Sequence, residues 1–102
     1  MSRTRIVERT VVVEIPMTNK FIPICRKTSS YRKYFELRSK RAQNTQEELE
    51  YQRAVKIIFC LEKNSGKIEN MIHKENNLIF VFKFYNEHDL KNFKIEVDEL
   101  TN

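Results

Sequence analysis

The pattern of hydrophobic and polar positions divides the chain near Gly66. Before this glycine, apolar residues recur mainly at helical spacing, and after it they alternate with polar residues as they do in strands. The segment 5–15 is an exception, because it is rich in β-branched residues and is ended by Pro16. We therefore predict a first strand over 5–15 and a mixed α+β chain as a whole.

Two helices are predicted between this strand and Gly66. In the segment 30–43, aromatic residues fall on one side of a helix and charged residues on the other. In the segment 46–62, Thr45 and Glu48 have the spacing of a capping box, and Gly66 can end the helix in a left-handed conformation. The aromatic density of the first segment and an apolar run in the second leave strands as the alternative.

The last third of the chain predicts a hairpin and two terminal elements. Strands are expected at 67–73 and 77–85, followed by a short helix over 86–93 and a last strand over 94–99. This order is that of ferredoxin-like folds. The predicted fold class is thus a small single α+β domain, 1–102, with an antiparallel or mixed four-stranded sheet packed on two helices.

A second architecture follows if the segment 94–99 is an edge strand of a hairpin. One strand, two helices and three antiparallel strands would then follow one another, and this order resembles the RelE-type ribosome-dependent ribonucleases. The resemblance implies phosphodiester cleavage by arginine, lysine and tyrosine side chains of the sheet and helices. The chain lacks the Gly-Tyr-Arg run often found on that family's central strands. We therefore expect no enzymatic activity, with a RelE-like ribonuclease as a less favoured alternative.

The strand 77–85 is apolar on both of its alternating faces, which is typical of a central strand covered on both sides. A covered central strand would form the middle of the hydrophobic core, with the first strand and the second helix packed against it. The predicted core consists of Val11, Val13, Ile15, Val55, Ile58, Leu61, Ile79, Phe80, Val81 and Phe82.

Composition excludes several classes of function. With one glycine in 102 residues, the chain cannot form the glycine-rich loops that bind nucleotide phosphates. The two cysteines and two histidines are widely separated, so we expect no metal and no cofactor. No apolar run is long enough to cross a membrane, and a cytoplasmic protein is expected. Abundant lysine, isoleucine and asparagine are compatible with a phage-type accessory protein, which would act in the host cytoplasm.

Charge is divided unevenly along the chain. The net charge is +5, but residues 1–44 hold eleven Lys/Arg against three Asp/Glu, whereas 45–102 are net acidic. The segment 26–41 combines seven cations, three aromatic residues and one acid. Cations bind phosphates, and aromatic rings stack on unpaired bases. The expected partner is therefore nucleic acid, with RNA or single-stranded DNA preferred, bound by Arg26, Lys27, Tyr31, Arg32, Lys33, Tyr34, Arg38, Lys40 and Arg41.

The acidic second half supports a different hypothesis. Carboxylates cluster on the predicted second helix and on the terminal elements. Such a surface can dock on a basic partner. The alternative function is therefore a modulator or inhibitor that binds a cellular protein through this half.

Overall fold

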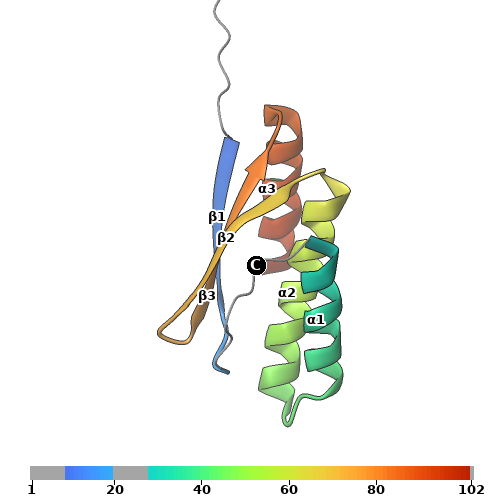
Figure 1. Cartoon of the computed structure of the whole chain (residues 1–102), viewed down its shortest axis with the longest axis vertical. Helices are drawn as coiled ribbons and strands as arrows, with labels where there is room; N and C mark the ends of the chain where they lie inside the picture. Colours follow the sequence, from blue (N-terminus) through green and yellow to red (C-terminus); the bar gives the residue numbers. More distant parts are fainter. Residues whose placement is uncertain (1–8, 20–27, 102) are drawn as a thin grey trace, which may run out of the picture.

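The computed structural model describes residues 9–19 and 28–101 (Figure 1). These residues form a small compact α+β domain with three helices and one three-stranded antiparallel sheet. In chain order, the elements are β1 (Arg9–Pro16), α1 (Thr28–Lys40), α2 (Thr45–Lys63), β2 (Lys67–Lys74), β3 (Asn77–Phe84) and α3 (Glu87–Thr101). No helix among the described residues is both long and apolar enough to cross a membrane.

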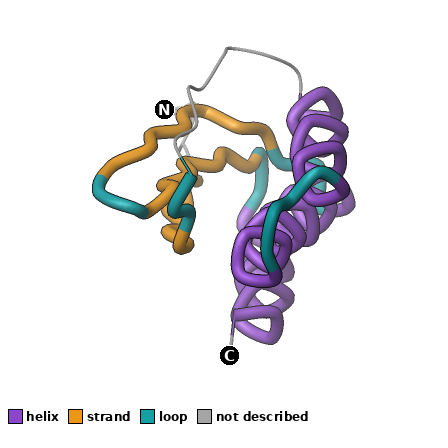
Figure 2. Tube along the Cα trace, turned by 90° about the horizontal axis from the view of Figure 1, so that it is seen from below, coloured by secondary structure: helices purple, strands orange, loops and turns teal. Residues whose placement is uncertain are grey.

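The sheet has the strand order β1-β3-β2, and the helices lie on one of its faces (Figures 1 and 2). Helices α2 and α3 pack on the sheet, and α1 packs along α2. Each strand has a buried side toward the helices and a more exposed side away from them. The fold therefore has two layers, with the core between them.

Aromatic rings fill the space between the two layers. Phe80 and Phe82 of β3 stack with ring centroids 5.1 Å apart. Phe35 of α1 contacts Phe80 edge-on at 6.5 Å, and Phe93 of α3 contacts Phe82 at 5.2 Å. All four rings are fully buried. One strand thus links the first and last helices through edge-to-face ring contacts, a favourable geometry for aromatic pairs.

The first strand, the first two helices and the hairpin are confirmed, with shifts of a few residues at their ends. Residues 5–8 of the predicted first strand lie outside the described residues. Helix α2 begins at Thr45, one residue before the predicted start, and its cap is Asn44, whose side-chain oxygen accepts a hydrogen bond from the backbone N–H of Glu47 at 2.8 Å. The capping role thus falls one residue earlier than the sequence pattern indicated.

Gly66, three residues after the end of α2, has a different role from the predicted one. Ser65, with φ of 58°, takes the left-handed conformation, and Gly66 does not. A Cβ atom on Gly66 would clash with the side chain of Leu61 and lie 2.6 Å from the ring of Phe84. Glycine is required here because the core packs directly against its backbone.

The prediction of a fourth strand was wrong, and with it both four-stranded architectures. Residues 94–99 belong to α3, which continues without a break from Glu87 to Thr101. Phe93 and Val97 are one helical turn apart and buried, whereas Ile95 is 58% exposed. The two-residue spacing of Ile95 and Val97 suggested a strand, but the four-residue spacing of the buried Phe93 and Val97 is that of a helix.

The expectation that β3 is covered on both faces was also wrong. Six of the ten predicted core residues are buried, and Val11 and Val55 pack against the core from its edge. Ile79 and Val81 are only half-buried, because they point to the face that carries no helix. An apolar strand pattern does not show how many layers cover a sheet.

Candidate nucleic-acid interface

The outer side of α1 carries three exposed cations, Lys33, Lys40 and Arg41, which we call the outer cations. They are separated by seven and eight residues, so they lie on one side of the helix, with Leu37 between them. Arg41 follows the last residue of α1 and continues its turn, since its N–H donates to the carbonyl of Leu37. Within the described residues, none of the three forms an ion pair. Their charges therefore face solvent.

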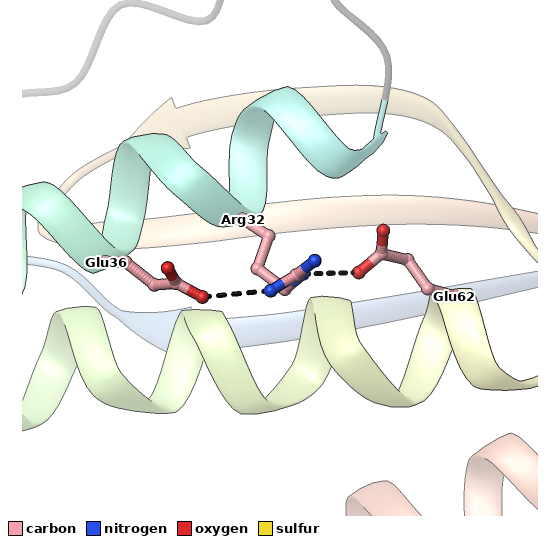
Figure 3. A network of polar contacts seen from close by, with 3 residues as sticks. All are labelled: Arg32, Glu36 and Glu62. Carbon is pink, nitrogen blue, oxygen red and sulfur yellow. Dashed lines mark hydrogen bonds and ion pairs between the residues drawn. The ribbon is translucent and has the colours of Figure 1, made fainter.

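Arg32 lies beside Lys33 in sequence but turns toward α2. Its Nε donates to Glu62 at 2.6 Å, and its Nη1 donates to Glu36 at 3.0 Å (Figure 3). The hydrogen bond and the charge of Glu62 raise the pKa of the Arg32 guanidinium. Arg32 thus links the two helices, and carboxylates accept hydrogen bonds from two of its nitrogens.

Arg38 is also held between the helices. Its Nη2 donates to the Tyr51 hydroxyl at 3.0 Å, and its guanidinium lies 5.4 Å from the centre of the Tyr51 ring and 5.9 Å from that of Tyr34. The hydrogen bond with Tyr51 raises the pKa of Arg38, outweighing the opposing effect of burial. Since Tyr51 is fully buried, Arg38 satisfies a hydroxyl that water does not reach.

The tyrosines expected to stack on bases belong largely to the core. Tyr31 is 5% exposed, and Tyr34 packs partly against the core with its ring edge-on to Phe35. The condition for stacking by Tyr31, an exposed ring, is therefore not met. Aromatic residues on a helix with this spacing formed its buried side, as amphipathic helices generally do.

Arg26 and Lys27 lie outside the described residues. The described residues hold fourteen Lys/Arg and thirteen Asp/Glu, a net charge of +1 against +5 for the whole chain. Most of the excess positive charge thus lies in the segments 1–8 and 20–27. Of the predicted site residues that the structure describes, the outer cations are the ones with exposed positive charges.

Sequence reasoning missed a second basic cluster, at the end of β3. Lys67 lies opposite Lys83 in the sheet and donates a hydrogen bond to the Tyr85 hydroxyl at 3.1 Å. This hydrogen bond lowers the pKa of Tyr85. Tyr85 is 77% exposed. The alternation of the strand places Lys83 and Tyr85 on one side, but the position of Lys67 depends on a register that the sequence does not reveal.

Several carboxylates of the acidic half serve internal contacts. Buried Glu50 accepts hydrogen bonds from the backbone N–H of Thr18 at 2.9 Å and from Gln46 at 2.8 Å. Burial raises the pKa of Glu50, but the hydrogen bonds from Thr18 and Gln46 outweigh it, and the net pKa is lowered. Glu62 binds Arg32, and Glu96 accepts from Asn64 and Lys63. These contacts leave fewer carboxylates to bind a protein partner.

The histidines make local contacts. The His73 ring lies 2.7 Å from the carbonyl oxygen of Met17, next to the end of β1, and the His88 ring contacts Asn92 one turn along α3. The described residues contain no group of three or more His, Cys, Asp or Glu side chains placed to hold a metal ion.

Comparison with known proteins gives no family for this chain. No protein-family model matches it, and no curated protein and no solved structure is significantly similar to it. A functional proposal therefore rests on the geometry of the described residues.

Proposed function

We propose that this protein binds nucleic acid without catalysis and contacts the phosphate backbone through the outer side of α1. The observation that supports the proposal most strongly is the exposure of Lys33, Lys40 and Arg41 on one side of the helix, without carboxylate partners among the described residues. Lysine and arginine in this setting release counterions when they neutralise phosphates. Arg32 and Arg38 support the helix rather than the contact.

The spacing of the outer cations suits a polyphosphate chain. Lys33 and Lys40 are seven residues apart, which corresponds to about 10 Å along a helix. Phosphates of one duplex strand repeat every ~3.4 Å along the duplex axis, so the two lysines span about three nucleotides. Phosphate contacts carry no sequence information. Because Tyr31 is buried and Tyr34 is half-buried, the proposal does not rely on stacking and includes no preference for single strands over duplex.

A binding titration by fluorescence anisotropy tests the proposal. The chain and a variant with Lys33→Gln, Lys40→Gln and Arg41→Gln are titrated against a labelled single strand and a labelled duplex at several salt concentrations. We expect weaker binding by the variant to both, and a log-log salt slope that is smaller in magnitude by about 2 on the single strand, at ~0.7 per phosphate contact.

The matched control is Lys63→Gln with Lys91→Gln and Lys94→Gln, which removes the same charge from the end of α2 and from α3. This control should retain most of the affinity. If both triple variants lose affinity equally, only net charge matters and the assignment to α1 fails. If the unmodified chain binds neither oligonucleotide at low salt, the proposed function is wrong.

A further inference from the structure

The face of the sheet away from the helices exposes a continuous apolar patch, formed by Val12, Ile72, Ile79 and Val81. Val12 is 62% exposed and Ile72 is 43% exposed. Val12 lies opposite Val81, and Ile79 lies opposite Ile72, so the patch crosses all three strands. Contiguous apolar side chains on a surface are typical of interaction sites.

Charged residues at the edges of this patch are arranged asymmetrically. Glu14 lies on β1, opposite Ile79, and Lys74 lies on β2, opposite Asn77. Since β1 and β2 flank β3 on its two sides, the acid and the base occupy opposite edges at the same end of the sheet. Glu14 is exposed and forms no ion pair within the described residues.

We propose that this face packs against the same face of a second copy of the chain, related by a two-fold axis parallel to β3. Such an axis keeps β3 over β3 and exchanges the edges, so that β1 of one copy lies over β2 of the other. Val81 and Ile79 then meet their own counterparts across the ~10 Å that separates packed sheets. Self-complementary surfaces of this kind form the commonest oligomers.

The same axis brings the charged edges together. Glu14 of one copy comes over Ile72 and Lys74 of the other, and symmetry makes this contact twice. Lys83 lies near the axis at the far end of the strand, where a lysine can extend its ammonium group into solvent. At this end of the sheet, the charges favour the second copy, because the face supplies both Glu14 and Lys74, whereas Lys67 and Lys83 lie at the other end.

The size of the face sets the expected affinity. Eight-residue strands are ~27 Å long, and three of them are ~14 Å wide. Two such faces together span ~760 Å², which is below the value of about 1,000 Å² for a stable specific interface and therefore fits a weak dimer. We expect a concentration-dependent monomer and dimer equilibrium with a dissociation constant in the micromolar range. The inference is independent of nucleic-acid binding, because α1 lies in the other layer (Figure 2).

Sedimentation equilibrium of the full chain, from about 1 to about 200 µM, measures this dissociation constant. Glu14→Lys alone, or Lys74→Glu alone, should weaken the dimer about tenfold, since each places like charges together twice. The variant with both changes should recover most of the affinity. Val81→Lys should abolish the dimer, and a thermal melt shows whether each variant remains folded.

A chain that is monomeric throughout this range overturns the proposal. A dimer that Val81→Lys leaves intact uses another surface and also overturns it. If the two charge reversals weaken the dimer separately and the double reversal does not restore it, the two-fold arrangement proposed here is wrong.

Discussion

The cations on α1 and directly after it form two sets that differ in their surroundings. Arg32 and Arg38 turn toward α2, where Glu62 and the Tyr51 hydroxyl hold them. The outer cations, Lys33, Lys40 and Arg41, turn toward solvent and form no ion pair among the described residues. The density of cations in a sequence therefore overstates the charge that a helix offers to a partner. The cations that pack against a neighbouring element are occupied by contacts within the fold, and the others remain exposed to solvent.

The largest expected effect comes from the inner side of α1. Phe35 is fully buried and packs on Tyr51 and Phe80, with ring centroids 6.2 and 6.5 Å away. Phe35→Ala should lower the free energy of unfolding by ~3 to 5 kcal/mol, which urea denaturation measures. Leu37 lies on the outer side and is 45% exposed, so Leu37→Ala should lower the free energy of unfolding by less than ~1 kcal/mol. Equal losses would mean that α1 does not have the inner and outer sides described above.

The next effect concerns Arg38. Arg38→Ala leaves the buried Tyr51 hydroxyl without its donor, and the expected loss is about 1 to 3 kcal/mol. Tyr51→Phe removes the acceptor but keeps the ring, so the double variant should lose less than the sum of the two single losses. Strictly additive losses in urea denaturation would show that the hydrogen bond contributes nothing.

The pH dependence of stability should depend on Glu50, a buried carboxylate of α2. Hydrogen bonds hold the pKa of buried Glu50 below its usual value, so its contribution to stability is present above the unfolded pKa of ~4.3. That contribution is lost as the pH falls toward the lower folded pKa. Between about pH 5 and 3, Glu50→Gln should flatten the fall of the unfolding free energy. A pH profile for Glu50→Gln as steep as that of the unmodified chain would contradict this role of Glu50.

The smallest expected effect on stability belongs to the outer cations. Changing Lys33, Lys40 and Arg41 to Gln should alter the free energy of unfolding by less than ~0.5 kcal/mol, because the three side chains make no ion pair that is lost. A calorimetric melting curve that matches the unmodified chain is the expected result. A large loss would place these residues among the structural cations.

The sequence was sufficient for elements whose periodicity matched their burial. Helix α2 is an example, since Tyr51, Ala54, Ile58 and Leu61 recur at helical spacing and all are buried. The sequence was insufficient for α3, because Ile95 and Val97 are two residues apart and suggested a strand, whereas Ile95 is in fact exposed on a helix. A partly apolar helix surface and a short strand can share the same local pattern.

The candidate site was predictable only as a segment. That α1 would be basic and amphipathic follows from its residues, but which cations remain exposed depends on its packing against α2. The partners Glu62 and Tyr51 lie 30 and 13 residues away from Arg32 and Arg38. No local pattern reveals contacts over such separations, and the open face of the sheet was hidden for the same reason.

Arg32 and Lys33 are adjacent in sequence, and comparing them tests the central claim most directly. The measurement is the log-log salt dependence of binding to a labelled single strand, for the unmodified chain, Lys33→Gln and Arg32→Gln. Lys33→Gln should reduce the magnitude of the slope by about 0.7, the contribution of one phosphate contact, and Arg32→Gln should leave it unchanged. Equal reductions, or a larger reduction for Arg32→Gln, would contradict the account.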